Sequence, residues 1–382
     1  MFRCEIVSEP ARFRALVDDW TRLHQACGGT VFSHHALLVA KIETSVERRR
    51  ALHAVVLWEG DRMVGAACLA KRRARIGRKL PLHAMKLTFL DQFDIGSNDI
   101  LLDPHVPGVA EAMARTVYEM PDVAIVDLFP LSPHAGGPAF LAAVRASGRM
   151  LAERDEMQSS LVDLTGGAAG FMARRSSKTR ETLRKKMRRA EAAGFQFVRA
   201  RGGEKAAHMV LAEALEMSFK SWKAAFGTNI GARAEERGFL HRLVAFPPAG
   251  CTLCVDTLRK DGIAVAFAIT LHHNGRAYGL ITDYDAAYSK ESLGLVACMQ
   301  AIFDAAEAGC ATFDTLRLSS LTESIGDRTE VLKRCHIRSR WNVAAGVILF
   351  EGLMRRIKDR TGPRAKRLTG RRKFLSRGVA EQ

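Results

Sequence analysis

The chain has 382 residues, of which 47% are hydrophobic and 26% charged, and its formal net charge is +17. This composition excludes a disordered chain, and the length favours two domains. No apolar run is long enough to span a bilayer,. Because the first residues, MFRCEIVSEPARFR, contain no apolar signal-peptide core, we expect a cytoplasmic protein,.

Eight cysteines are scattered along the chain, a density far below that of a disulfide scaffold,. Cys251 and Cys254 form the one CxxC pair, within an apolar segment that reads as a strand. No second pair or nearby histidine pair completes a zinc site. We therefore expect free thiols packed as small apolar side chains and no bound metal.

The positive charge is concentrated in two segments. Residues 174–189 contain nine basic side chains and one acidic side chain, and residues 355–377 contain eleven basic side chains and one acidic side chain. Such charge favours anionic partners, including CoA phosphates, acidic lipid and nucleic acid. Since no RNA-reading aromatic motif is present, we expect any binding to nucleic acid or acidic lipid to be weak and nonspecific.

The first half of the chain alternates between helical and strand patterns. Hydrophobic spacing and turn residues predict, in chain order, a helix at 10–26, strands at 52–58 and 63–70, a basic loop at 71–79, an irregular segment at 80–103, a helix at 106–119, a strand at 123–129, a helix at 139–147 and a strand at 157–164,.

A glycine-rich segment at 166–170 marks a boundary, after which the alternation resumes,. The patterns predict a helix at 176–193 capped by Ser177, a strand at 195–200, helices at 208–226 and 239–244, strands at 253–258, 264–271 and 277–283, a helix at 293–308, a strand at 312–318, a short helix around 324–334 and terminal strands at 337–350,. In the helix at 208–226, Phe219, Trp222 and Phe226 share a face that we interpret as core, with an acceptor pocket as the alternative for Trp222.

The segments 51–70 and 251–270 share one pattern, in which a strand, a charged turn and a strand of small apolar residues follow one another. We interpret this as a duplicated unit of mixed α/β (α+β) structure. The expected domains are an N-terminal lobe over 1–165, a C-terminal lobe over 166–350 and a flexible basic tail over 351–382.

The segment 277–308 predicts a strand, a loop and a helix. The first turn of a helix has free backbone N–H groups and a partial positive charge, so it can bind an anion. Gly294 lets a ligand approach the backbone, and Ser289 and Ser292 offer hydroxyl groups,. A pyrophosphate fits this pattern, although an ordinary strand–helix connection fits it as well.

Three patches between about 171 and 333 resemble the GNAT acetyltransferases of the CelD-like branch, which is associated with cellulose and exopolysaccharide biosynthesis. They are SSKTRETLRKKMRRAEAAG, YDAAYSKESLGLVACMQAIFDAAEAG, and FDTLRL followed by Asp327 and Lys333. Leu293 stands where this branch usually has Pro, and Leu332 stands where it has Tyr.

This resemblance implies two GNAT lobes in tandem, a plan shared with Fem-type aminoacyl transferases, and acetyl-CoA or another acyl-CoA as co-substrate. It implies that the pantetheine arm pairs with the backbone of one strand, and that the helix start after it binds the pyrophosphate. The residues concerned here are Leu280, Ile281, Thr282 and Asp283 for the strand, and Ser289, Ser292, Leu293, Gly294 and Leu295 for the loop and helix start.

Acyl transfer to an amine needs a base and an acid. The candidates for catalysis are Asp283, Tyr284, Asp285, Asp314 and Lys333, with Tyr288 as a further acid and with a structural carboxylate as the alternative for Asp314. On the basic helix, Lys178, Arg180 and Arg184 are candidates for binding the acceptor or another anion. His272 and His273, before a predicted turn, are expected to be solvated.

Three hypotheses follow. The first is an acyl-CoA-dependent N-acyltransferase, or O-acyltransferase, acting directly on a small-molecule amine, for example a sugar or polysaccharide precursor. The second is a Fem-like transferase that uses aminoacyl-tRNA. The third is a non-catalytic, GNAT-like scaffold that binds anions.

Overall fold

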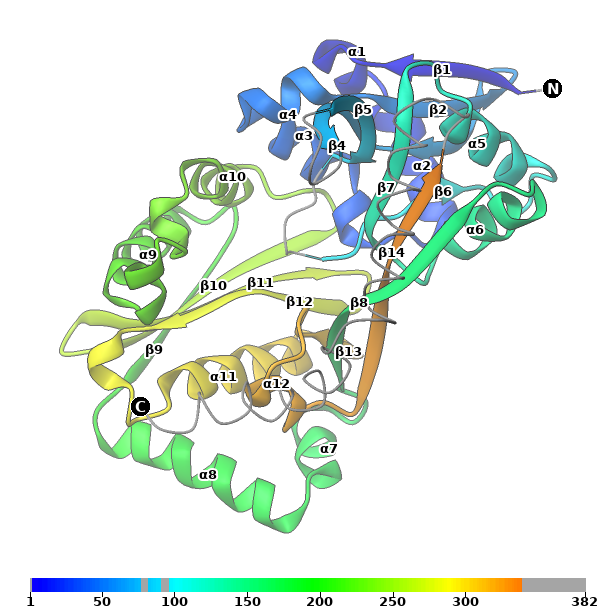
Figure 1. The fold of residues 1–382 in the computed structure, drawn as a ribbon. Helices are drawn as coiled ribbons and strands as arrows, with labels where there is room; N and C mark the ends of the chain where they lie inside the picture. Colours follow the sequence, from blue (N-terminus) through cyan, green and yellow to red (C-terminus); the bar gives the residue numbers. More distant parts are fainter. Residues whose placement is uncertain (1, 77–81, 91–95, 339–382) are drawn as a thin grey trace, which may run out of the picture.

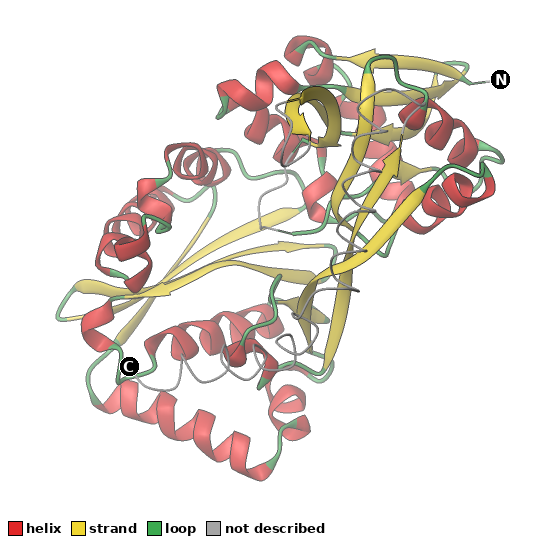
Figure 2. Ribbon diagram, viewed as in Figure 1, coloured by secondary structure: helices red, strands yellow, loops and turns green. Residues whose placement is uncertain are grey.

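The computed structural model describes residues 2–76, 82–90 and 96–338. The strands form a four-stranded sheet, ordered β1-β2-β3-β6, and a ten-stranded sheet, ordered β4-β5-β7-β14-β8-β13-β12-β11-β10-β9. Helices lie against these sheets (Figures 1 and 2), which confirms the expected mixed α/β class. Among the described residues, no helix combines the length and the hydropathy that crossing a bilayer requires.

The first half contains the four-stranded sheet and part of the large one. Its strands are β1 (Arg3–Val7), β2 (Ala54–Glu59), β3 (Arg62–Ala67), β4 (Leu69–Ile76), β5 (Leu82–Phe89), β6 (Leu101–Leu102), β7 (Val123–Leu131) and β8 (Leu151–Asp163). Its helices are α1 (Pro10–Arg14), α2 (Val17–Cys27), α3 (His35–Glu43), α4 (Val46–Ala51), α5 (Val109–Tyr118) and α6 (Gly137–Ala146), with a 3-10 turn, η1 (Val31–Ser33).

The second half supplies the rest of the large sheet. Its strands are β9 (Gln196–Arg201), β10 (Cys251–Lys260), β11 (Ile263–His273), β12 (Arg276–Tyr284), β13 (Thr312–Asp314) and β14 (Arg328–Arg338). Its helices are α7 (Gly167–Arg174), α8 (Ser177–Ala192), α9 (Lys205–Met217), α10 (Ala234–Ala245), α11 (Leu293–Glu307) and α12 (Ser320–Glu323), with 3-10 turns η2 (Ser218–Lys220), η3 (Trp222–Phe226), η4 (Ile230–Ala232) and η5 (Ala286–Tyr288).

One late strand joins the two halves. β14 lies between β7 and β8 and is antiparallel to both, so a segment from the end of the described chain completes the sheet of the first half. Figure 1 shows β7, β14 and β8 running side by side across the middle of the molecule. The halves therefore share one continuous sheet.

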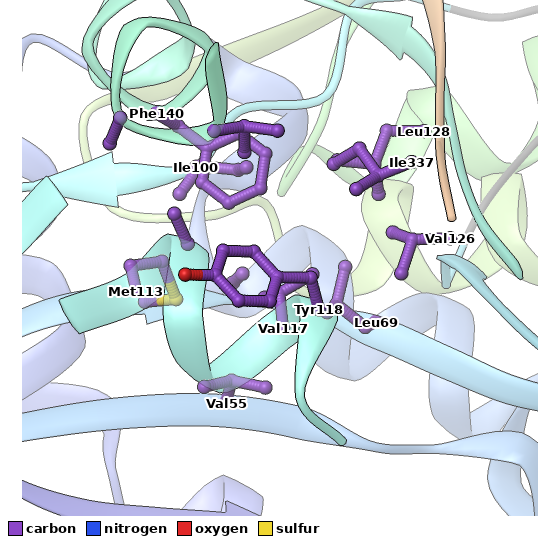
Figure 3. Close-up of a cluster of buried hydrophobic side chains, with 14 of the residues drawn as sticks. Val55, Leu69, Ile100, Met113, Val117, Tyr118, Val126, Leu128, Phe140 and Ile337 are labelled. Carbon is purple, nitrogen blue, oxygen red and sulfur yellow. The ribbon is translucent and has the colours of Figure 1, made fainter. Parts of the chain in front are cut away.

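Four hydrophobic clusters fill the layers. One packs α5 and α6 against β7 and β14, with Met113, Val126 and Ile337 among its members (Figure 3). A second lies under α9 and α10 and includes Phe32 from the first half. A third lies on the opposite face of the same strands, under α11 and α8. The fourth packs α2 and α3 on the small sheet. Strands β10–β12 are thus covered on both faces.

Several local predictions were wrong. The basic loop at 71–79 is strand β4 as far as Ile76, and 77–79 lie outside the described residues. The cap of α8 is Ser176, whose hydroxyl accepts from the Thr179 N–H, and not Ser177. The strand after α11 ends at Asp314, and most of the expected helix at 324–334 is strand β14. The predictions for 339–350 and 351–382 lie outside the described residues.

The helix predicted at 208–226 ends at Met217, and two 3-10 turns follow it. Leu211 and Leu215 on the same predicted face are buried, as expected, whereas Phe219, Trp222 and Phe226 are 54%, 51% and 72% exposed. The interpretation of the face as core was therefore wrong for the three aromatic residues. The helical spacing continued in the sequence, but the Ser221 side chain starts a new turn by accepting from the Lys223 N–H.

His272 and His273 are buried, so the expectation that they are solvated was wrong. The ring of His273 from β11 packs against His24 from α2 and His34 before α3, with ring centroids 5.4–5.6 Å apart. Burial, reinforced by the neighbouring histidines, lowers the pKa of His34 to about 4. Burial also lowers the pKa of His24 and His273. A neutral histidine cluster therefore seals the contact between the halves.

Replacing His34 should weaken the response of stability to acid. Above pH 6.5, His34 is neutral in both states; between pH 6.5 and 4 the unfolded chain binds the proton first, so stability falls over this range by on the order of 2–3 kcal/mol,. Asn in its place keeps an acceptor for the Ala36 N–H but does not titrate. Urea unfolding of H34N should show a flatter loss over this range than the wild type.

The matched control is H208N, because His208 is exposed on α9. It should keep the wild-type profile. Equal pH slopes for H34N and the wild type would contradict the assignment of a neutral cluster.

Candidate functional site

Strand β12 has an open edge. On one side β12 pairs with β11 along its length, whereas on the other it pairs with β13 over three residues, Arg276–Tyr278. Beyond Tyr278 no strand of the described chain continues this pairing, until an isolated bridge joins Asp285 to Ser221. Backbone groups between 279 and 284 therefore face an opening in the sheet.

The opening exists because β13 turns away from β12. The buried carboxylate of Asp314 forms an ion pair with Arg276, and it accepts hydrogen bonds from the Ser159 hydroxyl and the Leu316 N–H. Leu316 has a left-handed φ of 59°. The chain then follows β8, where the Leu318 N–H donates to the Gln158 carbonyl. Asp314 thus acts in positioning the chain at this point.

The open edge contains a bulge. Ile281 pairs with Ile269 and Gly279 pairs with Thr270, which leaves Leu280 as an extra residue in β12. Bulges redirect backbone groups and side chains near functional sites. Leu280 and Ile281 are half-buried and pack against the hydrophobic cluster under α9 and α10.

The start of α11 lies close to this edge. Ser292 precedes it with a left-handed φ of 59°, and its hydroxyl accepts a hydrogen bond of 2.8 Å from the Lys186 ammonium of α8. A Cβ on Gly294 would lie 3.0 Å from the Tyr284 ring, so any larger residue there would require the ring to shift. The N–H groups of Leu293 and Gly294, with Lys186 beside them, form a site suited to an anion.

Asp283 is the most enclosed candidate for catalysis. Burial raises its pKa, and the Lys223 ammonium, 3.5 Å from Oδ2, offsets part of that effect. Lys223 also donates to the Thr282 carbonyl at the open edge, at 3.0 Å. Asp285 is engaged differently, since its carboxylate caps η5 through the Ala287 N–H.

The remaining predicted residues are spread over the molecule. Lys333 lies on β14, bound to Glu153 at 3.0 Å and separated from β12 by β8 and β13. Arg180 is committed to the carbonyls of Ala173 and Arg175, while Lys178 and Arg184 lie exposed on α8. The predicted site residues between 280 and 295 lie on β12, in the following loop and at the start of α11, where Ser289 is exposed and Leu295 is half-buried. Lys333 lies apart from them.

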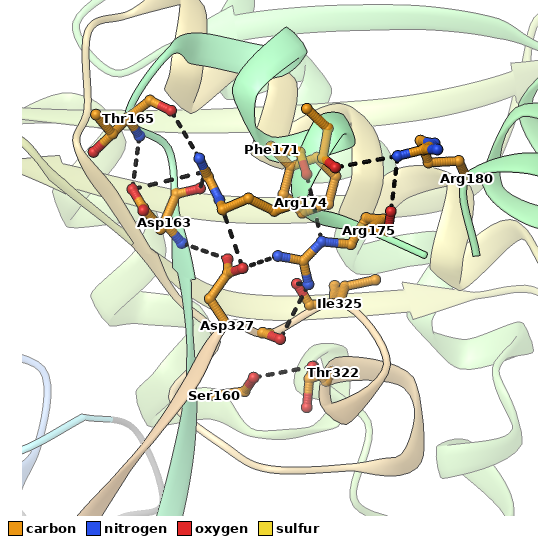
Figure 4. Close-up of polar contacts among 12 residues, drawn as sticks. Ser160, Asp163, Thr165, Phe171, Arg174, Arg175, Arg180, Thr322, Ile325 and Asp327 are labelled. Atoms are coloured by element: carbon orange, nitrogen blue, oxygen red, sulfur yellow. Dashed lines mark hydrogen bonds and ion pairs between the residues drawn. The ribbon is translucent and has the colours of Figure 1, made fainter. Parts of the chain in front are cut away.

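α8 itself is held by an arginine network (Figure 4). The Arg175 guanidinium donates to the carbonyls of Ile325 and Gly326 and forms an ion pair with Asp327. This fixes the start of α8 relative to the loop before β14. Asp327, taken from the sequence as part of a motif, is therefore a structural anchor.

Lys186 and Lys223 were missed by the sequence reasoning. Lys186 was one of nine basic residues in its segment, and only the packing of α8 on α11 distinguishes it. Lys223 fell in a segment predicted as helix, and no spacing signal placed it near β12. Among the described residues no group of three or more His, Cys, Asp or Glu side chains could hold a metal ion, and all eight cysteines are free thiols.

Comparisons with known proteins agree with this geometry. Residues 177–327 match the family model described as an acetyltransferase (GNAT) domain. The C-terminal domain (DUF2156) of a putative lysylphosphatidylglycerol synthetase from Agrobacterium fabrum is similar in fold, with a TM-score of 0.53 and 15% identity, over 90% of this chain and 95% of that chain. No curated protein sequence matches the chain.

Two further structures share the fold. A tandem GNAT protein from the clavulanic acid biosynthesis pathway has a TM-score of 0.50 and 14% identity, over 90% of this chain and 100% of that chain. FemX has a TM-score of 0.51 and 10% identity, over 87% of this chain and 96% of the FemX chain. The molecule therefore has the tandem fold of GNAT-type transferases. Residues 177–327 therefore match a GNAT domain, and the chain as a whole shares its fold with a tandem GNAT protein.

Removing the cation beside Asp283 should destabilise the protein. K223M leaves a buried carboxylate without its nearest cation, and we expect a loss of about 2 kcal/mol in the free energy of unfolding. The double variant K223M/D283N should lose less than the sum of the two single variants, as measured by urea unfolding.

K220M, at an exposed position of η2, is the control and should change little. If the losses of stability in K223M and D283N add up to the loss in the double variant, Lys223 and Asp283 do not interact.

Proposed function

We propose that the protein is an acyl-CoA-dependent N-acyltransferase. The observation that carries this proposal is the open edge of β12, which ends at the anion site of α11. A long ligand with phosphates at one end and amides along its length suits such an arrangement, because the N–H groups of the helix start favour the phosphates and strand backbone can pair with amides.

The residues present fit that ligand. Leu293, Gly294 and Lys186 would hold the pyrophosphate, with Ser289 and Ser292 nearby, and the backbone of 280–283 would pair with the pantetheine arm. Gly294 lets the Tyr284 ring pack against the start of α11, beside the backbone N–H groups that would face the phosphates. Acyl-CoA would supply the thioester whose acyl group is transferred.

The proton transfers fall to groups at the end of β12. Asp283, whose pKa is raised by burial, can take up a proton from an acceptor ammonium more readily than an ordinary carboxylate,. Tyr284, whose ring borders Gly294, is a candidate donor toward the leaving thiolate. Asp314 is already bound to Arg276 and Ser159, so we assign it a positioning role.

For the acceptor we propose a small-molecule amine, with a sugar or polysaccharide precursor as one class, and for the location the cytoplasm. Assays of CoA release with a panel of amines and amino sugars test this. CoA binding without release of CoA from any amine would favour a non-catalytic scaffold.

A second candidate, a Fem-like transferase using aminoacyl-tRNA, is favoured by the surface of α8. There Lys178, Arg184, Lys185, Arg188 and Arg189 are exposed on one helix. Because they lie on the same side of the sheet as the start of α11, a polyanionic donor could reach the anion site. The likeness to FemX concerns the fold and does not separate the two donors.

Lys186 should contribute directly to donor binding. K186A removes one charge-assisted contact and should weaken acetyl-CoA binding about tenfold in calorimetry. K185A is the matched control, because the neighbouring lysine is exposed and points elsewhere around the helix, and it should change the affinity less than about twofold. Equal effects of the two variants would contradict the proposed pyrophosphate site.

RNA binding separates the two donors. If the donor is acyl-CoA, the protein should bind tRNA and an unrelated RNA of equal length with similar affinity, and raising salt from about 50 to 200 mM should abolish both. The variant R184E/R188E should weaken both RNAs equally and leave acetyl-CoA binding in place. tRNA-selective binding that persists at the higher salt would support the Fem-like donor instead.

A further inference from the structure

A small apolar cavity lies at the bulge of β12. Its volume is about 30 Å³, and its walls include Leu280 and Ile281 from β12, Phe239 and Leu240 from α10, and Leu37 from α3. A cavity of this size exceeds the roughly 10–15 Å³ that one water molecule requires. The cavity is therefore bounded by both halves of the chain.

The cavity and the anion site lie on opposite faces of the sheet. α11 packs on one face with α8, whereas α9 and α10 cover the other, as Figure 1 shows. Leu280 and Ile281 line the cavity and belong to the open edge of β12, and the gap beside that edge lies near the start of α11. A ligand whose phosphates sit at the start of α11 and whose arm crosses this gap would place its far end at Leu280.

The lining selects what can enter. Eight of the eleven lining residues are aliphatic or aromatic, and the other three are Lys41, Arg48 and Glu236. The Lys41 ammonium lies 5.8 Å from the ring centroids of Phe32 and Phe239. A polar acceptor, such as a sugar amine, would lose its hydrogen bonds to water there. An acyl chain loses none, and each methylene that it buries strengthens binding about fourfold.

We propose that this cavity receives the acyl chain of the donor, and that the protein prefers a short apolar acyl group longer than acetyl. The inference rests on the proposed acyl-CoA activity. It also assigns a role to the first half of the chain, whose helix α3 supplies Leu37 as a wall of the pocket.

Calorimetry with acetyl-, propionyl-, butyryl- and hexanoyl-CoA and with free CoA tests the proposal. Butyryl-CoA should bind the wild type about tenfold or more tightly than acetyl-CoA. L37F, which fills the cavity, should reduce that advantage to about twofold or less with acetyl-CoA unaffected. F239A, which enlarges the cavity, should make hexanoyl-CoA the tightest-binding acyl-CoA. This variant still tests the proposal if L37F does not fold.

The matched control is L141F, the same change at a buried leucine in the separate cluster under α6, and it should keep the wild-type chain-length profile. Equal affinity for all acyl-CoAs would overturn the acyl pocket and leave the proposed function standing. An unchanged profile in L37F with a raised KM for the acceptor would also overturn it. Failure of every acyl-CoA and of free CoA to bind would remove the proposed function, and this inference with it.

Discussion

The ion pair between Asp314 and Arg276 controls the shape of the candidate site. A buried carboxylate is costly unless it is paired and hydrogen-bonded, and Asp314 meets both conditions only at the point where β13 stops,. With the carboxylate held there, the next residues turn through the left-handed Leu316 and follow β8. The gap beside β12 is thus a consequence of how one charge is buried.

The continuous sheet places part of the first half beside that gap. Because β14 returns to lie between β7 and β8, the first half is fixed relative to β12, and α3 can form a wall beside Leu280. The histidine cluster at the same contact adds packing that holds only while the rings are neutral. The proposed donor site and the joining of the halves therefore depend on the same region.

The sequence predicted much of the second half. The hairpins of β10–β12, the loop and α11 follow from period-two alternation, the Asn274-Gly275 turn and helical spacing, and these local signals survive tertiary packing,. The places of 280–283 on β12 and of 293–295 at the start of α11 were predictable because they depend on element order, whereas their role in donor binding stays a prediction.

Features that depend on residues far apart in the chain could not be predicted from the sequence. The sequence placed His272 and His273 next to a turn, but the rings that pack on His273 come from α2 and from the segment before α3, more than two hundred residues earlier. The exposed residues Phe219, Trp222 and Phe226 continue the helical spacing although α9 ends at Met217 and Ser221 starts a new 3-10 turn. The pairing of β14 with β7 leaves no local mark in either strand.

An exposed strand edge invites pairing with another chain, so an open edge needs protection while no ligand is bound. Here the protection comes from the segment after α9. Ser221 bridges to Asp285 at one end, and the Lys223 ammonium donates to the Thr282 carbonyl within the gap. A pantetheine arm that pairs with this edge would have to displace or share that ammonium. Because Lys223 also lies beside Asp283, the proposed donor binding would be coupled to the charge state of the buried carboxylate through one side chain,.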